Sequence, residues 1–537
     1  MRTPRLADLL LLLLGLVIVV PVGGVLAAWL QWDAASADIL REMAGTVLGG
    51  YALTSLVLCL AVALGVGLVG TACAAAVTMF DFPGRRTLEW ALLLPLAIPA
   101  YVVAYAYTDF LQFSGPLQSG LRAAFGREGR VFPEVRSLPG AAWVFVFSLY
   151  PYVYLLARAA LAERAVHLME AARLLGAPLG RRMRTVALPL ARPAVAAGIA
   201  LALMETLADF GVSSYFGIQT FSVGIYKAWL AMDNRIAAAQ LATSLLVVVA
   251  LLLLLEWKAQ RRLRFATTRG GRAGGLDAQP VVLRGGAAAG AFALCALPVL
   301  AGFVLPIAFM VRPLAADWSV LPWDRFVQWA FNSVRLGVLS AALAVVIALL
   351  LSFRLRQRPD AVTRTVVQLA GLGYAVPGAV IVVGLLLPVG WLQQAAPQLP
   401  SSYWVTGTVL GVVWAYLVRF MSVALQSVQS GYARVPASLD DSARMLGTSG
   451  MGLLARVHWP LLRRPAAAAA LLVFVDVMKE LPATMVLRPF NTDTLAVVAY
   501  QLARDERLGE AALPSLALVL VGLLPVVLLS RTLRDRR

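Results

Sequence analysis

Residues 170–193 read EAARLLGAPLGRRMRTVALPLARP, and this stretch decides how the chain is interpreted. The sequence on either side is apolar over membrane-spanning lengths, whereas this stretch is basic and is interrupted by Gly176 and Pro189. A similar stretch returns in the second half, where SARMLG at 442–447 matches AARLLG at 171–176 at an offset of 271. The chain therefore contains two copies of one unit, and the basic insert belongs to the repeat.

The composition indicates a membrane protein. The 537 residues are 60% hydrophobic and only 14% charged, with a mean hydropathy of +0.80, which is too little charge to cover a soluble surface of this size. Runs of about 20 apolar residues predict membrane-spanning helices. Twelve such runs are found, at 6–30, 53–79, 90–107, 141–161, 194–208, 236–255, 287–311, 334–351, 366–387, 404–425, 466–478 and 513–529.

These spans predict an all-α, polytopic membrane protein with about twelve transmembrane helices in two tandem six-helix repeats. The first repeat is expected over 1–256 and the second over 287–537. Between them, residues 257–286 are basic and rich in glycine, as expected of a cytoplasmic linker. Because each repeat has six spans, both copies have the same orientation, and parallel repeats of this kind are known in transporters.

The net charge of +18 is explained by topology rather than by a nucleic-acid partner. If the N-terminus lies inside the cell, the cytoplasmic segments hold 29 of the 46 lysines and arginines, which is the positive-inside bias of a protein in a lipid bilayer. Both termini are then cytoplasmic. The first apolar run is too long for a typical signal peptide, so we expect an uncleaved anchor.

The insert predicts a helix, a glycine break and a second, basic helix that runs into the fifth span. Gly176 is a natural residue to end the first helix. The distance from glycine to proline is 13 residues in both copies, from Gly176 to Pro189 and from Gly447 to Pro460. A plain solvated loop would not need to keep this spacing, so we expect a protruding hairpin that another protein grips.

At these residues the chain resembles the permeases of ABC importers of the type I kind. Their EAA loop has Glu-Ala-Ala, then Gly, then Leu-Pro, and loops near 163–193 and 434–465 follow this pattern, the second with Asp-Ser-Ala in place of Glu-Ala-Ala. In the family the loop docks on a cytoplasmic ATPase subunit, which implies two ATPase copies as partners and a bacterial inner-membrane location. The residues that carry this expectation are Glu170, Ala171, Ala172, Gly176, Pro189, Asp441, Ser442, Ala443, Gly447 and Pro460.

The chain has no ATP-binding motif of its own, so we do not expect an enzyme. A P-loop needs Gly-Lys-Ser/Thr, but the only lysines, Lys227, Lys258 and Lys479, follow Tyr, Trp and Met. ATP and Mg²⁺ are therefore expected on the partner ATPase, and no cofactor is expected on this chain. A proton-driven secondary transporter would also fit twelve spans in two repeats, but it would not need the EAA loops.

The fifth apolar run of each half is unusually short and ends in acidic residues. The first half carries Glu205 and Asp209, the second half carries Lys479 and Glu480, and Asp209 and Glu480 coincide at the offset of 271. Ionisable groups at membrane depth usually face a cavity, which makes these residues candidates for a translocation path. Alternatively, they lie at the membrane edge and cap or pair locally, with Lys479 neutralising Glu480.

The stretches after these acids resemble the fused, two-EAA-loop permeases of ferric-iron importers. The resemblance implies a periplasmic binding protein that delivers ferric iron, and Tyr215, Tyr226 and Tyr500 suit a hard cation that prefers oxygen. No metal ligand set is evident from the sequence. Fused permeases for thiamine or for phosphonate-type anions are the main alternatives, and the sequence does not distinguish naked from chelated iron.

The remaining metal-binding residue types give no site. Cys59, Cys73 and Cys295 fall within predicted spans without metal-ligand spacing, so we expect them to be packing residues. His167 and His458 both lie in the EAA loops and are expected at the surface. A membrane-embedded enzyme would need a catalytic cluster, and neither a His/Cys set nor a nucleophile motif is present in the sequence.

Overall fold

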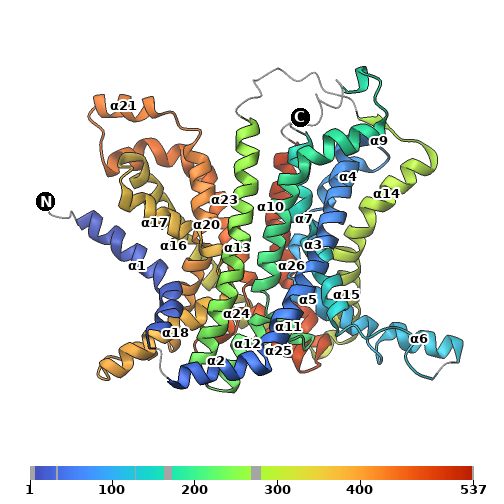
Figure 1. The fold of residues 1–537 in the computed structure, drawn as a ribbon, viewed down its shortest axis with the longest axis horizontal. Coiled ribbons are helices and arrows are strands. Elements are labelled where there is room, and N and C mark those ends of the chain that lie inside the picture. The colour runs from blue at the N-terminus through green and yellow to red at the C-terminus, as the bar shows by residue number, and fades with distance from the viewer. Residues whose placement is uncertain (1–5, 32–33, 127, 163–171, 268–279, 535–537) are drawn as a thin grey trace. The chain divides into compact units, whose positions relative to one another are not determined.

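The computed structural model describes residues 6–31, 34–126, 128–162, 172–267 and 280–534. Over these residues the protein is almost entirely helical, as predicted (Figure 1). The exception is a minimal parallel sheet in which β1 (Phe80–Asp81) pairs with β2 (Val281–Val282). The all-α expectation is therefore confirmed for the described residues.

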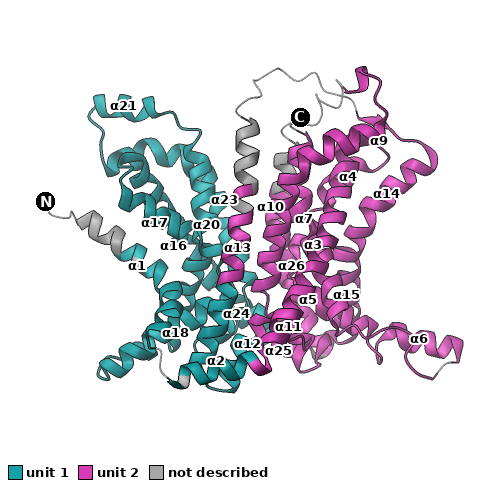
Figure 2. Cartoon of the chain, in the orientation of Figure 1, with its two compact units in different colours: residues 1–44, 224–246, 322–498 teal, residues 45–223, 247–321, 499–537 magenta. Residues whose placement is uncertain are grey.

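The helices form two compact units that cut across the two halves of the sequence (Figure 2). Unit 1 comprises residues 1–44, 224–246 and 322–498, and unit 2 comprises 45–223, 247–321 and 499–537. The helix that begins each half thus packs on the core of the other half. The predicted boundaries at 256 and 287 describe a sequence repeat, whereas packing joins segments from both repeats.

Unit 2 is built around three helices, α3 (Leu48–Met79), α7 (Leu138–Ala160) and α10 (Leu188–Ala208). On this core lie the first helices of the second half, which are α14 (Gly285–Val299), η6 (Leu300–Val304) and α15 (Leu305–Ala316). The unit is completed by α4 (Arg85–Ala91), η2 (Leu94–Ala97), α5 (Ala100–Leu111), α6 (Pro116–Phe125), α9 (Leu179–Arg182), η4 (Met183–Ala187), α11 (Gly211–Tyr215), η7 (Trp318–Val320) and α26 (Leu508–Arg534).

Unit 1 repeats this plan with α16 (Trp323–Gln357), α20 (Leu410–Tyr432) and α23 (Trp459–Lys479) at its centre. The chain's first helix, α1 (Leu6–Ala27), packs against α17 (Ala361–Gly371) and α18 (Gly378–Ala395). Further elements are η1 (Ala28–Gln31), η5 (Lys227–Ala231), η8 (Gly373–Ala375), α19 (Ser401–Thr406), α21 (Ala437–Met445), α22 (Met451–Leu453), η9 (Leu454–His458) and α24 (Pro482–Leu487). Four helices cross a boundary between the two units: α2 (Ala34–Thr46), α12 (Phe221–Tyr226), α13 (Arg235–Thr267) and α25 (Leu495–Arg504).

The third span of each half is broken, which the apolar runs did not predict. In the first half η2 ends before Pro99 and α5 begins after it, and in the second half η8 and α18 flank Pro377 in the same way. A proline lacks an N–H and pushes the preceding residue out of the helical region, so a helix stops there. The predicted span 366–387 is therefore wrong in extent, because only α18 is a long apolar helix here.

The fifth spans are not short, contrary to expectation. The helix α10 has 21 residues and follows α9 and the π-helix η4 without a break, and α23 also has 21 residues after α22 and the π-helix η9. Apolar runs underestimated both helices because their first turns hold arginine and proline. Proline is well tolerated there, since its missing N–H would be unpaired in any helix.

Nine helices among the described residues are long and apolar enough to cross a membrane, or ten if the pair 85–97 and 100–125, bent by 90°, is one span. The remaining two of the twelve predicted spans are α23 and the first span, where Val17–Leu30, the end of α1 and most of η1, is a shorter apolar helix. The helix α23 carries Arg463, Arg464, Asp476 and Lys479, which lower its hydropathy.

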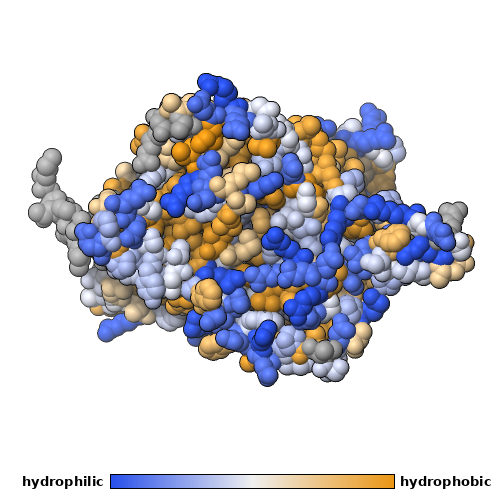
Figure 3. All heavy atoms as spheres, turned by 90° about the horizontal axis from the view of Figure 1, so that it is seen from below, coloured by the Kyte–Doolittle hydropathy of each residue, from blue (hydrophilic) through white to orange (hydrophobic). Residues whose placement is uncertain are grey.

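Two of the helices extend beyond the predicted spans. The helix α13 continues to Thr267, well into the predicted linker. In unit 2, α6 protrudes at the end opposite α9, and Figure 3 shows hydrophilic and hydrophobic residues side by side on this protrusion. Phe125 is 70% exposed there, and Arg122 lies 4.0 Å over the Phe113 ring. A helix with both kinds of side chain suits a membrane surface.

Candidate functional sites

The two loops that carry the repeated motif share one glycine turn. Gly176 has a φ of +78° and donates its N–H to the Arg173 carbonyl at 2.9 Å, while Gly447 has a φ of +81° and donates to the Arg444 carbonyl at 3.0 Å. In each copy the next residue donates to the carbonyl five positions back, at 3.0 and 2.9 Å. This is the Schellman arrangement that ends a helix with a left-handed glycine. The glycine break predicted from the sequence is therefore present in both loops.

Each loop also exposes an apolar pair, which the sequence analysis missed. Leu174 and Leu175 are 89% and 87% exposed, and Met445 and Leu446, at the same offset of 271, are 89% and 85% exposed. Large apolar side chains repeated at one exposed position of each copy are typical of a contact surface. The repeat itself contains the signal, since both matched pairs are large and apolar immediately before the glycine.

The other predicted docking residues lie on the same two loops. Glu170 and Ala171 are outside the described residues, as is His167. The remaining ones are half-buried (Ala172 and Pro189), exposed (Asp441, Ser442 and Pro460) or buried (Ala443). Pro189 and Pro460 are each the second residue of the helix that follows the loop, α10 and α23.

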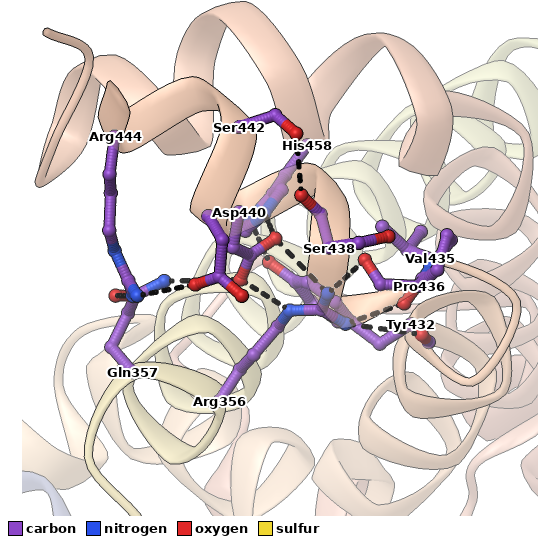
Figure 4. A network of polar contacts seen from close by, with 11 residues as sticks. Arg356, Gln357, Tyr432, Val435, Pro436, Ser438, Asp440, Ser442, Arg444 and His458 are labelled. Carbon is purple, nitrogen blue, oxygen red and sulfur yellow. Dashed lines mark hydrogen bonds and ion pairs between the residues drawn. The ribbon is translucent and has the colours of Figure 1, made fainter. Parts of the chain in front are cut away.

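A buried ionic network holds the second loop in place (Figure 4). Its centre is the Asp440 carboxylate in α21, which is 5% exposed and lies 2.7 Å from Nε and 3.1 Å from Nη2 of Arg356. The same guanidinium donates to the carbonyls of Val435 and Pro436, both at 2.9 Å. Arg356 thus fixes both the first turn of α21 and the turn that precedes it.

His458 completes this network, so its predicted surface position is wrong. The side chain is fully buried, with Nε2 3.0 Å from Oδ1 of Asp440 and Nδ1 3.2 Å from the Tyr432 hydroxyl. Its ring also meets the Phe353 ring edge to face. The sequence analysis assigned this histidine to a polar loop. In the structure the hairpin folds it back against the helices, where the Asp440 carboxylate forms a hydrogen bond with its ring.

The network sets the charge state of Asp440. Burial by itself raises the pKa of this carboxyl, but the hydrogen bonds and positive charge of Arg356, helped by His458, outweigh it and hold the pKa below its ordinary value. Asp440 is therefore ionised at neutral pH. An ionised carboxylate at this depth requires the guanidinium, because an unpaired buried charge is strongly unfavourable.

The acids that follow the fifth spans, Asp209 and Glu480, cap short helices. Asp209 ends α10, and its Oδ2 accepts the backbone N–H groups of Val212 and Ser213 at 2.9 and 3.2 Å. Glu480 ends α23 and accepts the equivalent N–H groups of α24, both at 2.9 Å. This matched geometry supports the alternative in which these acids act locally, and their role in a path stays a prediction.

The two acids differ in their charged neighbours. Glu480, 5% exposed, lies 3.4 Å from Nη1 of Arg419, so a cation from α20 faces it directly, rather than the predicted Lys479. At the offset of 271, the position of Arg419 is occupied by Ser148 in unit 2. Only the second copy therefore has an arginine at this position.

The remaining candidates for the path are dispersed. In unit 2, Glu205 is half-buried one turn before the end of α10, and the Tyr215 hydroxyl accepts from Nη2 of Arg136 at 3.3 Å. In unit 1, the Tyr226 hydroxyl donates to the Pro482 carbonyl at 2.6 Å. Among the residues that the structure describes, no group of three His, Cys, Asp or Glu side chains is placed to hold a metal ion. All three cysteines are free thiols.

Comparison with known proteins identifies the domain that contains the first loop. Residues 67–262 match the family described as the binding-protein-dependent transport system inner membrane component. This range begins within α3, includes the first loop and Asp209, and ends within α13.

The full chain is similar to whole permeases. It is 25% identical to the Fe(3+)-transport system permease protein FbpB 2 of Haemophilus influenzae, over 89% of this chain and 88% of that protein. It is 24% identical to the probable ABC transporter permease protein y4fN of Sinorhizobium fredii, over 88% and 85%. A putative 2-aminoethylphosphonate transport system permease protein, PhnV of Salmonella typhimurium, is 26% identical over 46% of this chain but 95% of its own length. Residues 67–262 thus form a domain of this family, and over most of its length the chain is similar to the inner-membrane permeases of transport systems.

Proposed function

We propose that this permease carries ferric iron inward, driven by two copies of a cytoplasmic ABC ATPase that dock on the two loops. Docking of the ATPase is supported by a surface that recurs in both loops. Each loop has a Schellman turn and an exposed apolar pair, Leu174 and Leu175 in the first and Met445 and Leu446 in the second. These four side chains are the contacts that the ATPase would bury.

The orientation follows from the same surface. The loops then face the cytoplasm together with both termini, in line with the arginine-rich inner segments. A periplasmic binding protein delivers the cargo at the opposite face. ATP and Mg²⁺ bind to the ATPase and not to this chain.

Ferric iron is the cargo best supported, because the relative that matches 89% of the chain is named for Fe(3+) transport. A phosphonate-type anion is the second candidate, since the half-length relative PhnV is named for 2-aminoethylphosphonate. Thiamine stays an alternative from the sequence resemblance alone.

Uptake into proteoliposomes tests the proposal. The permease is reconstituted with its ATPase, and radiolabelled ferric ion is supplied on the loaded binding protein, with and without ATP and with any proton gradient collapsed. We expect uptake that requires ATP and the ATPase but no proton gradient. Uptake that depends on the gradient would indicate a secondary transporter, and uptake of phosphonate but not of iron would reassign the cargo.

A further inference from the structure

One helix spans unit 1 from the second loop to the opposite end of the unit. The helix α16 has 35 residues and contains no proline. From Ser333 to Arg356 it rises about 35 Å at 1.5 Å per residue, slightly more than the hydrocarbon thickness of a bilayer, about 30 Å. A continuous helix of this kind moves as a rod, since its own hydrogen bonds resist bending.

The last two residues of α16 hold the second loop. Arg356 binds Asp440 and the carbonyls that precede α21, as described above. Gln357 accepts a hydrogen bond from Nη2 of Arg444 at 2.5 Å, near the exposed end of α21. Both turns of α21 are thus fastened to one end of α16 through side chains (Figure 4).

Toward its other end, α16 holds the segment 488–495, which joins α24 to the first residue of α25. The Asn332 amide donates to the Asp493 carbonyl at 3.1 Å, and the Ser333 hydroxyl accepts the backbone N–H of Leu495 at 2.8 Å. Both α16 side chains are buried, at 7% and 2% exposure.

The held segment has an internal ion pair and carries an exposed aromatic residue. Arg488 and Asp493 form an ion pair at 2.5 Å across the turn, and Asn491 adopts a left-handed φ of +58°. Phe490 at the tip of this turn is 96% exposed. A movement of α16 along or about its axis would therefore move a compact, outward-facing segment.

Among the described residues, the equivalent helix of unit 2, α3, shows one of these two connections. At its far end, Ser55 of α3 accepts the N–H of Phe221 at 3.3 Å, in the manner of Ser333. The same spacing of 278 places Thr78 where unit 1 has Arg356, and the Thr78 hydroxyl bonds back to the Ala74 carbonyl of its own helix. The arginine connection is a property of the second half.

We propose that α16 links the second loop mechanically to the segment 488–495, with Arg356 as the positioning residue at one end and Asn332 and Ser333 at the other. This inference rests on the proposed docking of an ATPase on the loop. A nucleotide-driven displacement of the loop then reaches the segment on the far side of the membrane. By thermodynamic reciprocity, binding at that segment changes the affinity of the loop for the ATPase.

A fluorescent reporter on the segment tests this link. Phe490→Cys is made in a background with Cys59→Ala, Cys73→Ala and Cys295→Ala, labelled with an environment-sensitive dye, and reconstituted with the ATPase in nanodiscs. The readout is the change in emission on adding a non-hydrolysable ATP analogue, alongside co-purification of the ATPase. A variant that merely destabilised the fold would lose ATPase binding as well. A variant that breaks the link loses the emission change but still binds the ATPase.

We expect a clear emission change in the parent protein and its loss or severalfold reduction in Arg356→Met and in Asn332→Ala, with the ATPase still bound. The matched control is Arg364→Met, because Arg364 is an exposed arginine whose side chain donates to the nearby Pro359 carbonyl. If Arg356→Met does not fold, Arg356→Gln and Asp440→Asn replace it, since each keeps a polar side chain and removes the charge of one partner.

The outcomes separate the link from the proposed function. A full emission change in folded Arg356 variants, or none in the parent with the ATPase bound, overturns the link. If the ATPase does not bind the parent protein at all, the proposed docking fails, and the link fails with it.

Discussion

Replacing the two loop glycines by alanine should weaken ATPase docking without unfolding the permease. Gly176 and Gly447 hold φ values of +78° and +81°, which L side chains rarely adopt. An added Cβ would meet nothing within 4 Å at either position. The whole effect of Gly176→Ala and Gly447→Ala is therefore conformational, and it falls on the turn that orients the apolar pair.

The magnitude follows from the left-handed conformation, which disfavours a residue with a Cβ by about 1–2 kcal/mol. Since each 1.4 kcal/mol is a tenfold change, the docking-competent form of each loop should become about 5- to 30-fold less populated. The membrane helices are held by their own packing, so the thermal unfolding of the permease should hardly change.

The assay is a titration of the purified ATPase onto the permease in nanodiscs, with transport and thermal unfolding measured on the same samples. Gly180→Ala and Gly452→Ala are matched controls in the same two loops. Both glycines have ordinary φ values, and an added Cβ meets either nothing or only Thr448 Cγ2 at an ordinary 3.6 Å. Alanine favours a helix there, so these variants should dock normally.

The reasoning is refuted if the double variant binds the ATPase as tightly as the parent and transports at the same rate. It is equally refuted if the control variants lose as much affinity, because the left-handed turn would then not be the cause. A loss of thermal stability in the double variant alone would show that the loops contribute to the membrane fold itself.

Three further predictions concern other features. Glu480→Gln should lower the free energy of unfolding by about 3–5 kcal/mol, since it removes the carboxylate charge that faces the buried Arg419; an unchanged melting temperature would show that the pair is dispensable. Because the Asp440 carboxyl has a lowered pKa in the folded protein, its stabilisation is complete above its ordinary pKa of about 3.9 and is lost as pH falls through the lowered value. Melting temperature against pH should be flatter in that acidic range for Asp440→Asn. Cysteines placed at Phe125 and Leu446, 70% and 85% exposed, should be labelled from outside and from inside the cell respectively, and the reverse pattern would invert the topology.

The sequence predicted the features that follow from composition and repetition. Apolar runs located most of the helices, and the glycine–proline spacing located both loop turns. These features depend on local chemistry: a glycine can end a helix in the left-handed conformation whatever surrounds it, and a long apolar segment has few alternatives in a bilayer.

The features that the sequence missed depend on neighbours distant in the chain. Nothing near Asp440 indicates that Arg356, 84 residues earlier, will pair with it, and nothing near Glu480 indicates Arg419 rather than the adjacent Lys479. Composition likewise gave no hint that the first helix of each half would pack on the core of the other half.

The missed contacts involve charged or titratable side chains at positions that are neutral in the other half of the chain. Arg356, His458 and Arg419 have Thr78, Ala187 and Ser148 at the matching positions. The first half in turn has an ion pair between the buried Glu89 and Arg158, where the offset of 271 places Gln429. Replacing one partner of such a pair is strongly unfavourable, which means that each pair must have been gained or lost through closely coupled changes. The two halves therefore share a backbone plan but not an interior chemistry, and a mutation at one position should have unequal effects in the two copies even where the loops themselves look alike.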